Sequence, residues 1–327
     1  MSSPSEQVTQ PVASSSTRPS GLRAPVAVAT VLIAYSFLGG LWLNRHGYSP
    51  EWLVLVREWF NKPLGLGEDF GFLAIALLLM SCGHLLVLRV TTASPAAFAR
   101  RLAWQVLPAA VIAVVLGLLF SLFADPLPFE FDYRANPLVL GLLAGLVFAV
   151  LLVLSAPLLP RQWHIAVVGQ LAVVTFALTA AGIADAPQLG ILASLVVLSV
   201  IGELLWLSKS GIARFWEVAP LVLFGLSLLV VSEHLFREAR DRWFTVAAVT
   251  ALLLMLLFVR GQASTTRPRP VEWLFSRGYY LVLLCGVLAY PLVGLLQPLT
   301  LPVSYIVVLL AWGLGAELLH RWFGKST

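Results

Sequence analysis

Charged residues are scarce in this chain of 327 residues: they make up 11% of the sequence, whereas hydrophobic residues make up 59%. A water-soluble domain carries about 25% charged residues, so the composition excludes a globular cytosolic protein. Cysteine is scarce as well. The two cysteines, Cys82 and Cys285, both fall inside apolar runs. Their number and position exclude a disulfide framework and a cysteine-based zinc site.

Several catalytic signatures are also missing. The sequence has no glycine-rich phosphate loop, no His-Glu-x-x-His, no Gly-x-Ser-x-Gly and no pair of aspartate-rich motifs. These absences argue against an ATPase, a zinc protease, an α/β-hydrolase and a membrane prenyltransferase, and no metal site is expected. The net charge of +5 does not indicate a nucleic-acid partner, because in a membrane protein an excess of basic residues marks cytoplasmic loops.

Long apolar runs, by contrast, are abundant. A helix of about 17 to 25 apolar residues crosses the roughly 30 Å of hydrocarbon in a bilayer. One uncharged stretch, Tyr279 to Ala316, is too long for a single crossing and is divided where Pro298 and Pro302 end a helix. The sequence therefore predicts an all-α, polytopic protein with the lipid bilayer as its first partner and ten spans, at 24–44, 70–88, 102–124, 137–159, 163–184, 187–207, 218–235, 243–259, 279–296 and 301–319.

The basic residues predict how these spans are oriented. With the N-terminus inside the cell, Lys and Arg are distributed two to one in favour of the cytoplasmic side, as the positive-inside rule requires. This predicts both termini inside and a multi-pass protein of the cell membrane, by inference a bacterial plasma membrane. Residues 1–20 are rich in Ser, Thr and Pro and are expected to form a disordered cytoplasmic tail. Residues 21–322 form the membrane domain, and 323–327 form a short cytoplasmic tail.

The longest outer loop, 45–69, has a pattern of its own. Ser49, Pro50 and Glu51 are typical of a helix start, with an N-cap, a proline at N1 and an acid in the first turn. Apolar residues then follow at helical spacing from Trp52 to Phe60. We expect a short helix in the outer interface of the membrane. It is either a connector that rests on the membrane or a lid over an outward-facing site.

Three motifs lie within residues 21–108. They are Gly21-Leu22-Arg23 before the first span, Gly67-Glu68-Asp69-Phe70-Gly71-Phe72 before the second, and Phe98-Ala99-Arg100-Arg101-Leu102 at the start of the third. These motifs, together with ten spans that have both ends inside and close in a basic and aromatic tail, resemble the acyltransferase-3 family of integral membrane acyltransferases. The resemblance in architecture covers most of the chain.

The resemblance implies acyl transfer. The donor would be acyl-coenzyme A, with no tightly bound cofactor, and the acceptor a hydroxyl group on a glycan, a lipid or a secondary metabolite. Arg23, Arg100 and Arg101 would hold the donor phosphates, which guanidinium groups bind in a bidentate manner.

Two positions depart from the family pattern. Ala34 stands where the family has the first-span histidine that serves as base, and alanine has no titratable group. Trp104 stands where the family has a further arginine. His84, in the second span, is the best substitute for the missing base, although a histidine bonded to a helix carbonyl is the plainer interpretation. Either the chemistry has moved to other residues, or this is an inactive family member that acts in export or assembly of an envelope molecule.

Two acids fall within or beside apolar runs, where charged groups are costly. Glu203 lies near the cytoplasmic end of the sixth span, six residues before Lys209. We expect its carboxylate to reach the membrane surface or to form an interhelical ion pair. Glu317 precedes Arg321 by four residues, which predicts a salt bridge at a helix end.

Overall fold

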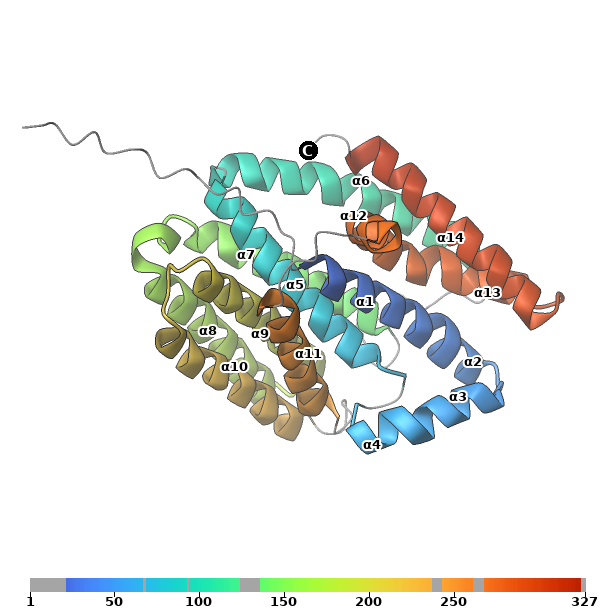
Figure 1. Cartoon of the computed structure of the whole chain (residues 1–327), viewed down its shortest axis with the longest axis horizontal. Coiled ribbons are helices and arrows are strands. Elements are labelled where there is room, and N and C mark those ends of the chain that lie inside the picture. Colours follow the sequence, from blue (N-terminus) through green and yellow to red (C-terminus); the bar gives the residue numbers. More distant parts are fainter. Residues whose placement is uncertain are drawn as a thin grey trace, which may run out of the picture.

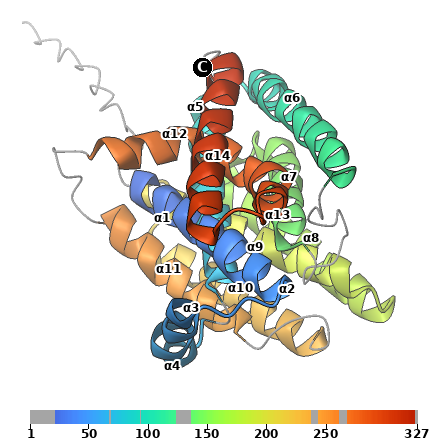
Figure 2. The same cartoon turned by 90° about the vertical axis from the view of Figure 1, so that its right-hand side faces the viewer.

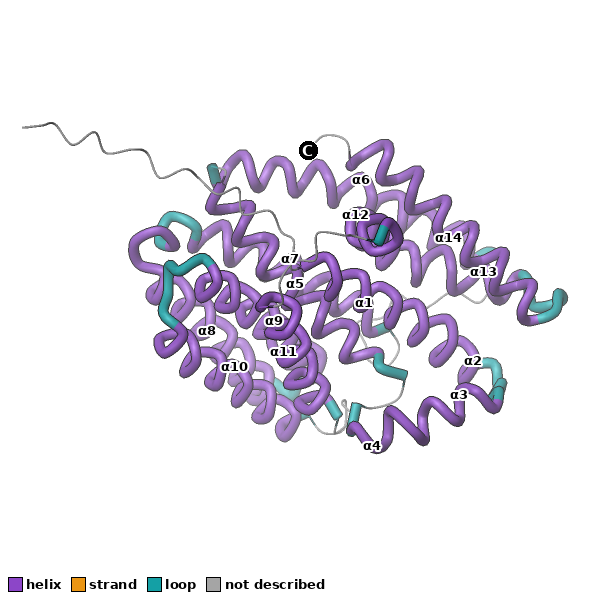
Figure 3. The backbone as a smooth tube through the Cα atoms, viewed as in Figure 1, coloured by secondary structure: helices purple, strands orange, loops and turns teal. Residues whose placement is uncertain are grey.

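The computed structural model describes residues 22–66, 69–92, 94–123, 136–236, 243–260 and 268–324. Figure 3 shows helices joined by short loops, and the described residues contain no strand, so the predicted all-α class is confirmed. The helices, labelled in Figure 1, are α1 (Arg23–Ala34), the π-helical η2 (Tyr35–Leu41), α2 (Trp42–Arg45), α3 (Glu51–Val56), the π-helical η3 (Arg57–Asn61), α4 (Lys62–Leu64), α5 (Gly71–Thr92), α6 (Pro95–Ser121), α7 (Pro137–Ser155), α8 (Leu159–Ile183), α9 (Pro187–Lys209), α10 (Phe215–Leu235), α11 (Phe244–Arg260), α12 (Arg269–Leu284), the π-helical η5 (Cys285–Ala289), α13 (Tyr290–Leu295) and α14 (Leu301–Phe323).

Each of the ten predicted spans coincides with a helix. Nine helices of the described residues are long and apolar enough to cross a membrane. The remaining apolar helix, α11, has 17 residues and is about 25 Å long at 1.5 Å per residue. The expected tail 1–20 lies outside the described residues.

Two helices begin seven or more residues before their predicted spans. The third span was expected from residue 102, but α6 starts at Pro95, where the backbone N–H of Ala97 donates to Ser94 Oγ at 3.3 Å. The ninth was expected from residue 279, but α12 starts at Arg269. Hydropathy locates only the apolar part of a helix, whereas caps and prolines set its first residue.

Contacts between helices give the relative directions of several pairs. A Cβ atom on Gly141 of α7 would touch Ile75, and one on Gly145 would touch Leu79, so α5 and α7 run parallel. In the same way, Gly278 of α12 lies against Val26 and Thr30 of α1, and Gly294 of α13 lies against Trp42, so α1 runs parallel to α12 and α13.

The remaining pairs extend this pattern. Ser81 of α5 donates to Met255 of α11 at 3.4 Å. Nearer the start of both helices, the ring of Phe72 in α5 stacks on that of Phe244 in α11. Helix α11 therefore runs parallel to α5. Helices α9 and α10 run antiparallel, because Gly190 lies against Phe236 and Gly225 against Val197 and Ile201. The directions of these pairs agree with the alternation that ten consecutive crossings require.

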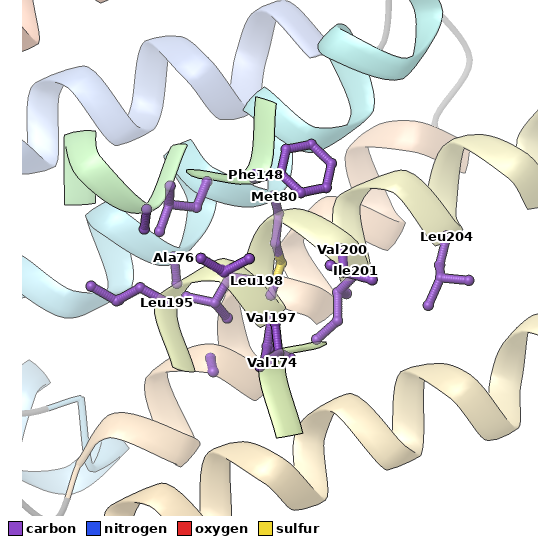
Figure 4. Close-up of a cluster of buried hydrophobic side chains, with 14 of the residues drawn as sticks. Ala76, Met80, Phe148, Val174, Leu195, Val197, Leu198, Val200, Ile201 and Leu204 are labelled. Atoms are coloured by element: carbon purple, nitrogen blue, oxygen red, sulfur yellow. The ribbon is translucent and has the colours of Figure 1, made fainter. Parts of the chain in front are cut away.

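Helices α5 and α9 form the centre of the bundle. A Cβ atom on Gly83 of α5 would collide with the backbone carbonyl of Ser199, and one on Gly202 of α9 would collide with that of Met80. The two backbones therefore touch at this crossing, as small residues allow in membrane helices. Apolar side chains of α5, α7, α8 and α9 fill the surrounding space (Figure 4).

Other helices present apolar side chains to the outside. Helix α6 lies at the edge of the bundle (Figure 2), and only 17% of its apolar window is buried. Soluble proteins rarely expose contiguous apolar surfaces of this kind, which fits a bilayer around the bundle. The large exposed side chains of α6 include Leu107, Val111, Val114, Leu118 and Leu119.

The predicted helix of the outer loop, named the interface helix here, is confirmed as α3, η3 and α4, which Figure 1 shows lying across one end of the bundle. Its position at a membrane surface stays a prediction. Trp59 is 72% exposed and Phe60 57%, while Leu53 is fully buried against the bundle. The predicted cap was wrong by one residue. Pro50, and not Ser49, is the N-cap, and its carbonyl accepts from Leu53 N–H at 2.9 Å.

Candidate functional site

The two arginines at the start of α6 line the larger of the two best-defined hollows among the described residues. This open hollow of about 260 Å³ is lined by Arg100, Arg101, Trp104 and Gln105. Trp104 follows Arg100 by one helical turn, and Gln105 follows Arg101 by one turn, so the four side chains share one face of the helix. Both arginines are exposed, and neither forms an ion pair with a described residue. The structure thus brings the predicted arginine pair together with Trp104, which the sequence analysis treated only as a departure from the family pattern.

Arg23 lies in a different environment. It forms an ion pair with Glu272 at the start of α12, and its guanidinium lies 5.9 Å from the centre of the Phe275 ring. Its side chain is 18% exposed, and it is not among the described residues that line the hollow on α6. An anion at Arg23 would therefore have to compete with Glu272.

A second group of ion pairs lies between α12 and α14. Arg277 donates to Glu317 at 2.9 Å, Arg321 donates to the other carboxylate oxygen at 2.9 Å, and Trp273 Nε1 donates at 3.2 Å. The predicted salt bridge at the end of α14 is confirmed. Because Glu317 accepts from three donors, this group ties the two helices together and has no free acid for chemistry.

His84 is enclosed in α5. It is 3% exposed, and its Nδ1 has no hydrogen-bond partner among the described residues. The hollow on α6 does not include it, and the second hollow, of about 10 Å³, is lined only by apolar residues and glycine. The expected bond to a helix carbonyl is not formed at Nδ1. As described, the ring lies in packed interior and not in a substrate-sized space.

Glu203 departs most clearly from its prediction. The residue is 0% exposed, so its carboxyl does not reach the membrane surface. It forms no ion pair with any described residue, while Lys209 is exposed at the end of α9. Both expected arrangements were wrong, because α9 is packed against α5, α7, α8 and α10 along its length.

At the opposite end of the bundle, a polar cluster joins the interface helix to α5. Arg57 of η3 donates to both oxygens of Asp69, at 2.9 and 2.5 Å, and to Asn44 at 3.1 Å. The Asp69 side chain is only 7% exposed. Gly40 of η2 packs so closely against this carboxylate that a Cβ atom would not fit.

Asp69 is part of the second sequence motif, but its partner Arg57 could not be predicted from that motif. The motif placed an acid at the start of the second span, and this was the available clue. The Arg57–Asp69 ion pair holds the interface helix to the bundle. If this helix is a lid, this ion pair, called the latch below, is the contact that keeps it closed. Asp69 has a left-handed φ of 61°, a conformation that residues other than glycine adopt where the surrounding contacts hold it.

No family model, curated protein or solved structure matches the chain.

Proposed function

We propose that this protein is an integral membrane acyltransferase that moves a short acyl group from cytoplasmic acyl-coenzyme A to a hydroxyl group on a glycan, a lipid or a secondary metabolite. The observation that carries the proposal is the hollow on α6, where Arg100, Arg101 and Trp104 lie together. With the orientation predicted from the basic residues, this hollow lies at the cytoplasmic end of the bundle, the side from which the donor arrives.

The chemistry of the hollow suits the head of such a donor. Two guanidinium groups bind phosphate oxygens as charge-assisted, bidentate partners, and an indole ring offers a face for stacking an adenine. The volume of about 260 Å³ falls just below the roughly 300 to 1,000 Å³ of sites for small ligands. It therefore suits the phosphates and ring, with the acyl arm extending from it. In this proposal Trp104 exchanges the charge of the family's second arginine for a stacking surface.

Transfer to a hydroxyl also requires a base, and His84 is assigned that role. Because its ring lies in packed interior, α5 and its neighbours would have to open before an acceptor could reach it. A base held this far from solvent would act only in the opened state.

A second candidate function is favoured by two positions that no longer suit acyl transfer. Ala34 replaces the family histidine, and Arg23 is occupied by Glu272, so two positions of the family's chemistry are not available. In this alternative the protein binds its anionic ligand at the α6 hollow without acyl transfer, and acts in export or assembly of an envelope molecule.

Mass spectrometry of envelope glycans, lipids and secreted metabolites separates the two. A deletion strain is complemented with the wild type, with the double variant Arg100→Gln/Arg101→Gln, or with His84→Gln. The enzyme hypothesis predicts that an acyl-sized mass is lost in the deletion strain and restored only by the wild type. Unchanged acylation together with a molecule that accumulates inside the cell would support the export role instead.

The matched control is Arg161→Gln. Arg161 is an exposed arginine in the first turn of α8, at the end of the bundle predicted to be cytoplasmic, and it does not line the hollow. Its loss changes the net charge by the same amount per residue and is expected to leave acylation intact.

A further inference from the structure

Glu203 is an ionisable group enclosed in the most buried of the spanning helices. The apolar window of α9 is 83% buried, and Glu203 itself is 0% exposed. Charged groups within a membrane bundle are costly unless they are paired. A carboxyl group at this position therefore needs either a cation or a proton.

No cation in the part of the chain that the structure describes pairs with it. The ionisable residues on the helices packed against α9 make no hydrogen bond or ion pair with Glu203, and α7 has none. Neither of the two best-defined hollows reaches the carboxyl, and the described residues contain no cluster of three His, Cys, Asp or Glu that could hold a metal ion. The ionisable residues in question are Cys82, His84 and Arg89 on α5, Arg161 and His164 on α8, Glu217, Glu233 and His234 on α10, Arg260 on α11 and Lys209 on α9 itself.

A second buried polar group lies on α8, a helix that packs against α9. Gln170 is 3% exposed, and its Oε1, like both carboxyl oxygens of Glu203, has no hydrogen-bond partner among the described residues. Two buried polar side chains on helices that pack together thus have unused hydrogen-bonding capacity.

The next hydrogen bonds fix which end of the amide faces which neighbour. Ser155 Oγ donates its single proton to the carbonyl of Leu151 at 2.9 Å, so it can only accept from Gln170. Gln170 Nε2 donates to it at 2.8 Å. The nitrogen of the amide is therefore committed to Ser155, and the oxygen Oε1 is left as an acceptor without a donor.

An ionised carboxylate only accepts hydrogen bonds, whereas a carboxylic acid also donates one. We propose that Glu203 is a proton-binding site inside the membrane, whose protonated carboxyl donates to Gln170 Oε1 and so completes a chain from Glu203 through Gln170 and Ser155 to Leu151. Release of the proton leaves an unpaired anion between α8 and α9. Proton binding at Glu203 thereby stabilises the contact between these two helices, and proton release weakens it.

Dicyclohexylcarbodiimide tests the proposal directly, because this apolar reagent adds to protonated carboxyl groups inside membranes. The full chain, purified in detergent, is treated at neutral pH and at increasingly alkaline pH, and the labelled peptide is identified by mass spectrometry. We expect one reagent mass on Glu203, less label as the pH rises, and none in Glu203→Gln. The control acid is Glu317, which is paired with two arginines and is expected to stay unlabelled.

Two results would overturn the proposal. One is a folded wild-type protein in which Glu203 remains unlabelled at every pH. The other is protection of Glu203 by sodium ions in place of protons, which would make it a cation site. The variant Glu203→Gln keeps the size of the side chain and supplies an amide N–H to Gln170 Oε1. We expect it to fold, and to gain thermal stability relative to the wild type as the pH is raised. A constant difference between the two proteins over the same pH range would also contradict proton binding.

Discussion

The crossing of α5 and α9 offers the sharpest test of the packing. Replacing Gly83 with alanine adds one methyl group at a point where the backbone carbonyl of Ser199 already fills the space. A side chain could rotate away, but a backbone carbonyl within a helix cannot. The two helices must therefore move apart, and the reciprocal contact between Gly202 and the carbonyl of Met80 is lost with them.

The size of the effect follows from this geometry. Overpacking a core costs about 1 to 3 kcal/mol when side chains can adjust, and we expect the upper end, about 3 kcal/mol, because the obstacle is backbone. Alanine regains at most about 1 kcal/mol of helix propensity over glycine, which does not offset the loss. The assay is thermal unfolding of the purified protein in detergent.

Gly169 of α8 supplies the matched control. It is an exposed helical glycine, and a Cβ atom there would meet nothing within 4 Å. Gly169→Ala should unfold at the same temperature as the wild type or slightly above it, while Gly83→Ala unfolds well below. If the two variants unfold at the same temperature, the close crossing of α5 and α9 is wrong.

Two further contacts give predictions by the same assay. Asp69→Asn should cost about 3 kcal/mol, since breaking a buried ion pair leaves the Arg57 charge uncompensated; the double variant Asp69→Asn/Arg57→Met should recover part of that loss, and no recovery would contradict the latch. Trp312 Nε1 donates to the carbonyl of Leu281 at 2.8 Å, so Trp312→Phe should cost about 1 kcal/mol, whereas the exposed Trp322 should tolerate the same change; equal effects would refute the bond.

The number of helices could be predicted from sequence because apolar runs report directly which segments can cross a membrane. Their positions in the bundle could not. Helices α5 and α6 have the same peak hydropathy of 2.3, yet 72% of the α5 window is buried and only 17% of the α6 window. Hydropathy does not distinguish a helix surrounded by other helices from one surrounded by lipid. For the same reason sequence predicted that Glu203 reaches the membrane surface or forms an interhelical ion pair, whereas packing on all sides encloses it without one.

The pairing of charged residues could not be predicted from sequence either. Arg23 and Glu272 are separated by 249 positions, and only the packing of α1 against α12 brings them together. By contrast, part of the α6 hollow could be predicted from sequence, because Arg100 and Arg101 are adjacent and Trp104 follows Arg100 by one helical turn. Residues at such spacing share a helix face whatever the tertiary structure.

Equilibrium binding of coenzyme A to the purified full chain is the measurement that tests whether the α6 hollow holds the phosphates of an acyl donor. Each lost arginine should weaken binding about tenfold, because a charge-assisted hydrogen bond contributes about 1.5 kcal/mol or more. We therefore expect Arg100→Gln/Arg101→Gln to bind at least about a hundredfold more weakly than the wild type, with Arg161→Gln unchanged. Equal affinity in all three proteins, or no binding to the wild type, would contradict the account.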